Sequence, residues 1–241
     1  MRHLERQMNK VKKHLLSLGT MVEESLHDAI RAIQNRDVEL AEKVINRDRQ
    51  IDDQEIEVEE ECLHTLALHQ PVAHDLRFLV SVLKINSDLE RIGDLAVHVA
   101  EQAKFLANEG RVEQWPFDLT GMSQQVEWMM RTSLDALVNV DTEQAAKVRE
   151  VDDEVDDIHR GMYASVTEQM RQHPDQLEQM IHFLNISRQL ERTADHACNI
   201  AKDVMYLAEG QIVRHRGGRV SAGDSAREAG DRTGSTDGSE G

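Results

Sequence analysis

The sequence predicts an all-α protein built from two tandem, similar three-helix bundles and a disordered C-terminal tail. The 241-residue chain contains only three prolines, and aromatic residues make up 3% of it. Residues 1–210 are rich in Ala, Leu, Val, Glu and Arg, a composition that favours helices. Two blocks of sequence recur in the same order, which indicates that one bundle was duplicated.

The internal repeat rests on two matched blocks. A shift of 104 positions aligns nine identical residues in the first block, among them the pairs Asp37/Asp141, Asp48/Asp152 and Asp52/Asp156. A shift of 101 positions aligns Leu-Glu-Arg-Ile-Gly-Asp at residues 89–94 with Leu-Glu-Arg-Thr-Ala-Asp at residues 190–195. The difference of three positions falls between the blocks, where turns are expected around Pro71 and Pro174.

Turn signals divide each repeat into three long helices. Asp37 is the expected N-cap of a helix, and Asp141 marks the equivalent point in the second repeat. In the first repeat we expect helices at residues 2–35, 38–69 and 72–109. In the second repeat we expect them at residues 117–139, 142–172 and 175–209. Because the turns are short, neighbouring helices must run antiparallel.

The predicted domains follow from these helices. Residues 1–112 form the first bundle, residues 113–212 form the second, and residues 213–241 form the tail. The tail mixes Gly, Ser, Arg and acids without apolar periodicity, which predicts disorder.

Charge and cysteine usage restrict the class of function. The net charge of −17 argues against binding to nucleic acid, which requires a basic surface. The two cysteines, Cys62 and Cys198, fall within helical patterns and are expected to be buried thiols. No signal peptide or membrane-spanning run is visible, so we expect a cytoplasmic protein that does not insert into the membrane.

Acidic residues of the first repeat fall on the buried side of its helices. Relative to Val44, Asp48 lies at about 40°, Glu55 at about 20° and Asp52 at about 80°, at the edge of the apolar stripe. On the next helix, Glu90 and Asp94 lie within about 20° of the stripe centre defined by Leu83, and Glu101 lies at that centre.

The second repeat shows the same pattern. Relative to Val148, Asp152 lies at about 40° and Asp156 at about 80°. Glu191 and Asp195 straddle the stripe centre of the last helix, and Asn199 lies at about 60° from it. Each bundle therefore directs four acids towards one seam between two helices.

Ionised carboxylates in a seam are unfavourable unless something compensates them. The stripes supply few cations, chiefly Lys202 and Arg188, so bound metal is the preferred interpretation, with a solvated acidic groove as the alternative. Oxygen ligands favour divalent or trivalent ions such as iron, manganese or magnesium, with zinc less favoured, and more than one ion per bundle can be bridged. The predicted ligands are Asp48, Asp52, Glu90, Asp94, Asp152, Asp156, Glu191 and Asp195. Candidate peripheral ligands are Glu55, Glu101, Asn199, His98 and His159.

A rival metal pattern, Glu-x-x-His, occurs twice. Di-metal oxidases with ferritin-like folds use it on paired helices. Here Glu24–His27 and Glu61–His64 point about 100° to 200° away from their stripes, so we expect these four residues at the surface.

Several segments resemble the PhoU family of phosphate-transport accessory regulators. These are Gln-Pro-Val-Ala-His-Asp-Leu-Arg at residues 70–77, the block at residues 89–94, and residues 190–201 and 207–215. The resemblance covers roughly residues 1–215. It implies a six-helix fold and multinuclear metal clusters at the paired acidic motifs, which map onto the eight predicted ligands. Leu95 and His98 replace the His and Asn usual in the motif, which the second repeat keeps as His196 and Asn199, and Thr193 replaces an aliphatic residue.

The resemblance also implies a regulatory role. Such proteins contact the ATPase of the high-affinity phosphate transporter and the phosphate-sensing histidine kinase, restrain the phosphate regulon, and are commonly homodimers. Arg77, near the start of a helix, is a candidate partner-binding residue, with a local ion pair to a helix-capping Asp75 as the alternative.

We therefore predict a metal-binding adaptor that is not an enzyme. The sequence contains no glycine-rich phosphate loop and no nucleophile paired with a base at a suitable spacing. The alternatives are a carboxylate-bridged metalloenzyme of the phosphohydrolase or oxidase type, and a purely structural helical spacer that binds no metal.

Overall fold

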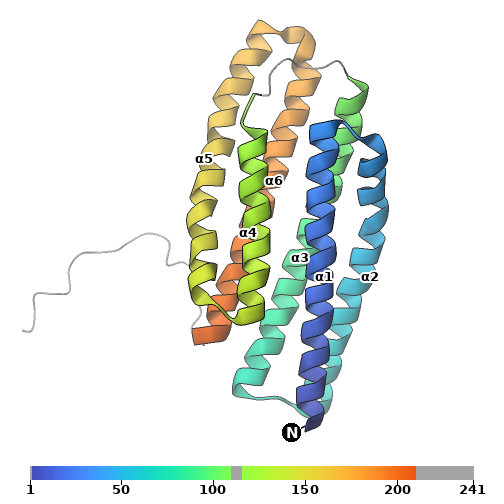
Figure 1. Cartoon of the computed structure of the whole chain (residues 1–241), viewed down its shortest axis with the longest axis vertical. Helices are drawn as coiled ribbons and strands as arrows, with labels where there is room; N and C mark the ends of the chain where they lie inside the picture. Colours follow the sequence, from blue (N-terminus) through green and yellow to red (C-terminus); the bar gives the residue numbers. More distant parts are fainter. Residues whose placement is uncertain (1, 110–115, 210–241) are drawn as a thin grey trace, which may run out of the picture.

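The computed structural model describes residues 2–109 and 116–209, which form helices joined by short turns (Figure 1). The helices are α1 (Arg2–Asn35), α2 (Val38–His69), α3 (Ala73–Asn108), α4 (Leu119–Asn139), α5 (Thr142–Gln172), the 3-10 helix η1 (Pro174–Gln176) and α6 (Leu177–Glu209). The all-α prediction is confirmed, and the predicted helices agree with these bounds within two residues. The predicted tail and the boundary between residues 112 and 113 lie outside the described residues. No described helix is both long enough and apolar enough to cross a membrane.

The helices form two three-helix bundles that lie side by side. Helices α1, α2 and α3 make the first, and α4, α5 and α6 make the second. Figure 1 shows α3 and α6 antiparallel at the junction, with the first bundle extending further at the lower end and the second at the upper end. Helices α3 and α6 therefore each pack against their own bundle and against the other one.

The first turn of each bundle has the same construction. Arg36 and Val140, which are equivalent in the two repeats, adopt left-handed backbone conformations with φ of 56° and 52°. The next residues, Asp37 and Asp141, cap the following helix, and the Asp37 carboxylate accepts a 2.9 Å hydrogen bond from Leu40 N. The predicted N-cap is thus confirmed. Hydrogen bonds donated by the backbone and side chain of Gln144 hold the pKa of Asp141 below its usual value.

Burial is concentrated on α3 and α6 because both are covered on two sides. Their packed faces include small residues that let helices approach closely, namely Ala96, Ala100, Ala103, Ala194, Ala197 and Ala201. Large apolar side chains such as Leu79, Ile85 and Phe183 fill the remaining space. These packed faces fix the rotation of α3 and α6, and with it the direction of their acidic side chains.

The junction between α3 and α6 is polar at its margins. The side-chain pairs that cross it include Lys84 with Asp203 (Nζ to Oδ1, 2.8 Å), His196 with Asp88 (Nδ1 to Oδ1, 2.7 Å) and His182 with Gln102 (Nδ1 to Oε1, 2.5 Å). The His182 ring also stacks on Phe105, with ring centroids 3.6 Å apart. The pairs fix the register in which the two bundles meet.

A second contact between the bundles occurs where α1 meets α4. A Cβ atom added at Gly19 would lie 2.9 Å from Cδ2 of Leu134, which is closer than packed carbon atoms approach. By contrast, a Cβ added at Gly161 on α5 would meet nothing within 4 Å. Glycine at position 19 thus permits the close approach of α1 and α4.

The two glycines provide a matched test of this contact. Gly161→Ala should stabilise the protein by about 0.5–1 kcal/mol because alanine is the better helix former. Gly19→Ala should stabilise the protein less than Gly161→Ala does, or should destabilise it, since Leu134 must move. Denaturant unfolding would measure the free energy of unfolding of both variants. In a Leu134→Ala background, Gly19→Ala should stabilise the protein as Gly161→Ala does. Equal gains at the two glycines in the unaltered background would contradict the packing described here.

Candidate functional site

The first acidic cluster lies between α2 and α3, where Asp48 and Asp52 face Glu90 and Asp94. The charges of Asp52 and Asp94 act on Asp48, and those of Asp94 and Asp52 act on Glu90. Asp48, Glu90 and Asp94 are partly buried, whereas Asp52 is exposed at the rim. The structure therefore brings together the four acids that the helical angles selected.

Gly93 on α3 allows the two helices to approach at this cluster. A Cβ added there would lie 3.2 Å from Cγ2 of Ile51 and 3.9 Å from Oδ1 of Asp48. The absence of a side chain lets Glu90 and Asp94, on either side of Gly93, come close to α2.

The predicted peripheral residues of the first cluster differ in position. Glu55 accepts a 2.8 Å hydrogen bond from Nδ2 of Asn86, and its charge also acts on Glu90. His98 is exposed but close enough for its charge to act on Asp48. Glu101 is exposed, and no interaction in the described part of the chain links it to the cluster. Arg91 lies 3.4 Å from Glu90 and 3.3 Å from Asp94 at the outer edge.

The second acidic cluster lies between α5 and α6 at the equivalent place. Asp195, Asp156 and Asp152 all act on Glu191, and Asp195 and Asp156 act on Asp152. The four predicted acids therefore also meet in this bundle. Lys202, as expected, is near enough to offset the charges of Asp152 and Asp195.

The remaining candidates in the second bundle bond to side chains other than the four acids, although the charge of Asp156 acts on His159. Asn199 donates to Oδ1 of Asp88 at 3.5 Å and accepts from Lys202 at 3.3 Å. His196 contacts the same Asp88 oxygen, so the His and Asn of this motif join α6 to α3. Asp88 was not identified from the sequence because its partners belong to the other repeat. His159 bonds the Ser187 hydroxyl across 2.7 Å.

The clusters are electrostatically unfavourable when they hold only carboxylates. Partial removal from water, followed by the charges of neighbouring acids, raises the pKa of each of five groups, namely Asp48, Glu90, Asp152, Glu191 and Asp195. In addition, Oδ1 of Asp48 is buried without a hydrogen-bond partner. An unpartnered oxygen surrounded by other carboxylates is what a hard cation would satisfy, so these residues fit the expected metal ions.

The spacing within the clusters is nevertheless wider than in a closed mononuclear site. Among the described residues, three ligand atoms lie within 4.8 Å of one another only at His14, Glu57 and Glu61. This corrects the expectation that Glu61 is a surface residue, because its side chain is only 15% exposed against α1. The other Glu-x-x-His residues, Glu24, His27 and His64, are exposed as predicted.

Arg77 is partly buried near the start of α3. Within the described chain it forms no ion pair with Asp75, which lies instead 3.7 Å from His74, and its buried Nε has no hydrogen-bond partner. Asp75 does not cap α3 either, because the N-cap is Val72 and no side chain bonds there. The local ion pair considered as an alternative is therefore absent.

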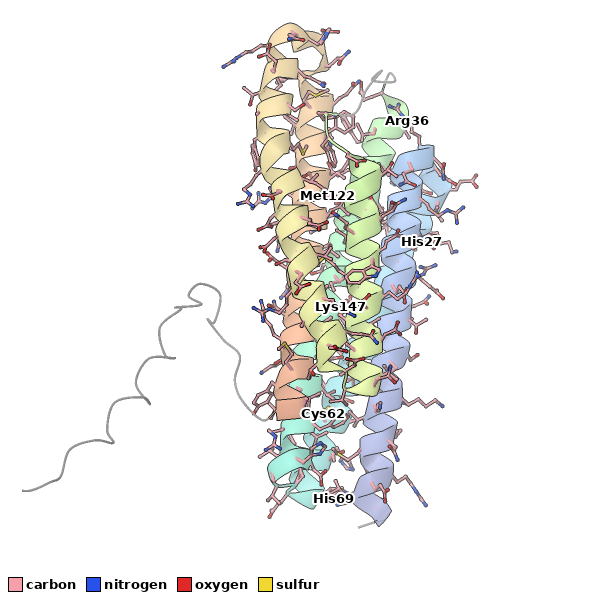
Figure 2. The ribbon with its side chains drawn as sticks, turned by 60° about the vertical axis from the view of Figure 1, so that its left-hand side comes forward. His27, Arg36, Cys62, His69, Met122 and Lys147 are labelled. Atoms are coloured by element: carbon pink, nitrogen blue, oxygen red, sulfur yellow. The ribbon has the colours of Figure 1, made fainter. Side chains whose placement is uncertain are left out.

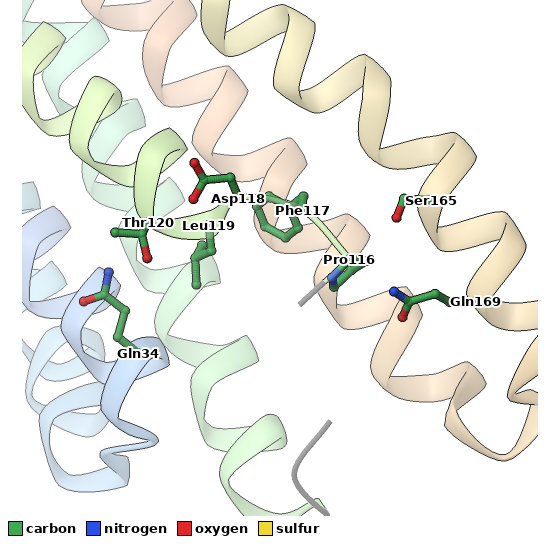
Figure 3. Close-up of a pocket in the computed structure, with 8 residues that line it drawn as sticks. All are labelled: Gln34, Pro116, Phe117, Asp118, Leu119, Thr120, Ser165 and Gln169. Carbon is green, nitrogen blue, oxygen red and sulfur yellow. The ribbon is translucent and has the colours of Figure 1, made fainter. Parts of the chain in front are cut away.

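An open pocket lies away from both clusters. It has a volume of about 910 Å³ (Figure 3) and is lined by Gln34, Pro116, Phe117, Asp118, Leu119, Thr120, Ser165 and Gln169. Asp118, the one carboxylate among the described lining residues, caps α4 by accepting a 2.9 Å hydrogen bond from Gly121 N. The pocket contains none of the predicted metal ligands.

The raised pKa values predict how pH affects the metal-free protein. Because the folded pKa of Glu90 exceeds its unfolded value, its stabilising contribution is complete below an unfolded pKa of about 4.3 and is lost as pH rises through the folded pKa. Glu90→Gln should therefore raise Tm by about 2–4 °C near pH 7.5 but have little effect near pH 4. Thermal unfolding in EDTA would measure this, with the exposed Glu150→Gln as control. An equal change at both pH values would refute it.

Comparison with known proteins agrees with this architecture. The PhoU domain profile matches the chain twice, at residues 15–103 and 119–204, one match in each bundle. The phosphate-specific transport system accessory protein PhoU homologue of Pseudomonas aeruginosa is 36% identical over 219 residues, covering 89% of this chain and 90% of that protein. The homologue of Aquifex aeolicus is 36% identical over 213 residues, covering 88% of this chain and 96% of that one.

Solved structures give the same result. The crystal structure of PhoU from Pseudomonas aeruginosa superposes with a TM-score of 0.84 at 35% identity, covering 86% of this chain and 99% of that one. The phosphate transport system regulatory protein PhoU from Streptococcus pneumoniae gives 0.79 at 28% identity, covering 87% of this chain and 99% of that one. Sequence, repeat structure and fold therefore agree, and the chain belongs to the PhoU family.

Proposed function

We propose that this protein regulates phosphate transport and phosphate-starvation signalling in the cytoplasm as a metal-binding adaptor rather than as an enzyme. The observation that carries the proposal is similarity along nearly the whole chain to proteins named as accessory or regulatory components of the phosphate transport system. Because both bundles match the same domain profile, the similarity extends over both halves of the molecule.

Metal binding is the chemical part of this proposal. The two clusters are equivalent in the repeats, and each gathers four carboxylates, whose mutual repulsion Arg91 and Lys202 offset only in part. Iron, manganese or magnesium would neutralise this charge, and the spacing suits more than one bridged ion per cluster. Exposed Asp52 and Asp195 have the freedom to change rotamer on binding.

Protein contacts are the regulatory part. The proposed partners are the ATPase of a phosphate ABC transporter and a phosphate-sensing histidine kinase, and we propose that the protein acts as a homodimer. A chain with a net charge of −17 would meet partners through polar, salt-sensitive contacts. Arg77 supports this role because it has no ion-pair partner of its own in the described residues, and its partly buried side chain is positioned by α3.

Metal content tests the first part. Glu90→Ala/Asp94→Ala should remove the metal of the first bundle and lower the total bound by about half, because ligands of one cluster do not reach the other. Elemental analysis of untagged protein would measure it, with the exposed pair Asp53→Ala/Asp153→Ala as matched control. Unchanged metal content in the cluster variant, or an equal loss in the control, would exclude these acids as ligands.

Signalling tests the second part. Deleting the gene should release the phosphate-starvation response in phosphate-rich medium, because an adaptor that restrains a kinase acts by its presence. When the deletion strain is complemented with the Arg77→Ala variant, the phosphate-starvation response should stay active. The purified variant should keep its fold and its metal. A reporter of the regulon would measure the response in both strains, with the exposed Arg31→Ala on α1 as control. Normal repression in the deletion strain, with no transporter or kinase component recovered at low salt, would refute the regulatory role.

A further inference from the structure

A separate group of metal-ligating side chains lies between α1 and α2. It comprises His14 on α1 with Glu57 and Glu61 on α2, next to Cys62, which is labelled in Figure 2. Nδ1 of His14 lies 3.3 Å from Oε1 of Glu57 and 3.4 Å from Oε2 of Glu61. One ligand atom from each of the three side chains falls within 4.8 Å of the others.

This group is distinct from the first acidic cluster. Glu57 and Glu61 lie about 140° to 180° around the α2 axis from Asp48 and Asp52. Asp48 and Asp52 face α3, whereas Glu57 and Glu61 face α1. The two sets of carboxylates therefore occupy opposite faces of one helix.

The three side chains do not satisfy one another by hydrogen bonding. Nδ1 of His14 and Oε2 of Glu61 are both buried and have no hydrogen-bond partner. Their separation of 3.4 Å exceeds the usual range for such bonds, about 2.7–3.2 Å. Leaving buried polar atoms unpaired costs about 1–3 kcal/mol per atom, so the arrangement points to an additional binding partner.

The spacing instead matches ligands arranged around one small cation. In a tetrahedral site with bonds of about 2.0–2.1 Å to nitrogen and oxygen, neighbouring ligand atoms lie about 3.3 Å apart. The distances of 3.3 and 3.4 Å from Nδ1 to the two carboxylates agree with that geometry. An imidazole nitrogen among the ligands favours zinc over the hard ions expected at the oxygen-only clusters.

Charge at the site favours the same conclusion. The site contains the two carboxylates of Glu57 and Glu61 but one lysine, Lys10, whose Nζ atom contacts Oε1 of Glu61. With His14 neutral, the group keeps a net negative charge, and Oε2 of Glu61 remains available. Lys10 is more than half exposed and can stay in place when the other oxygen is ligated.

We propose that His14 Nδ1, Glu57 Oε1 and Glu61 Oε2 bind a zinc ion that joins α1 to α2, with water as the fourth ligand. In this arrangement Nδ1 of His14 donates its lone pair to the zinc ion and the ring proton lies on Nε2. The competing arrangement is a protonated His14 shared between the two glutamates, without metal.

Cobalt substitution separates this site from the acidic clusters. A tetrahedral Co²⁺ site with a nitrogen ligand absorbs visible light far more strongly than six-coordinate oxygen sites. Metal-free, full-length protein titrated with Co²⁺ should develop such a band, which Zn²⁺ should displace. The band should persist in Glu90→Ala/Asp94→Ala, whose loss of cluster metal is a separate result. Its absence from the unaltered protein would refute the proposal.

Histidine substitutions provide the matched control. His14→Gln should abolish the cobalt band, whereas His27→Gln, on the same helix and 2.6 Å from the single carboxylate of Glu127, should keep it. Because His14→Gln can also disturb packing, imidazole 15N resonances of the unaltered protein give an independent reading. Zn²⁺ should shift Nδ1 of His14 and leave Nε2 protonated. A spectrum showing both nitrogens protonated and insensitive to Zn²⁺ would establish the shared-proton arrangement instead.

Discussion

The antiparallel contact between α3 and α6 fixes the direction of the acids that these two helices bring to the clusters. Each of the two helices is covered on one side by its own bundle and on another by its counterpart, so neither can rotate without opening a packed face. That restraint holds Glu90 and Asp94 towards α2 and holds Glu191 and Asp195 towards α5. The two acidic clusters are consequences of how the bundles meet as well as of how each bundle folds.

Crowding of like charges follows from this arrangement. Burial and repulsion both act against ionisation at Asp48 and Glu90, and the same holds at Asp152 and Glu191. A purely structural protein would gain stability by replacing such residues with apolar ones. Their presence at equivalent positions in both repeats is explained if cations occupy the seams, so that binding and folding stability are linked at the same atoms.

The sequence predicted most of the fold because helical periodicity and turn residues are local signals. Asp37 and the eight seam acids were found in this way, since a regular helix fixes the angle of each side chain. The angle relative to one apolar stripe does not show which neighbour covers the other faces. Glu61 was therefore assigned to the surface although it packs against α1, and Asp88 was overlooked although it joins His196. Contacts between repeats depend on a register that periodicity alone does not contain.

The residues at the α3–α6 junction differ between the two repeats. The positions equivalent to Lys84 and Asp88 are Asn185 and Gln189, and those equivalent to Asp203 and His196 are Gln102 and Leu95. The pairs Lys84–Asp203 and Asp88–His196 thus have no charged counterparts at the equivalent positions of the other repeat. Pairing two copies of the first half would place Lys84 against Gln102 and Asp88 against Leu95. The two halves are therefore not interchangeable at this contact, because each supplies side chains that the other lacks.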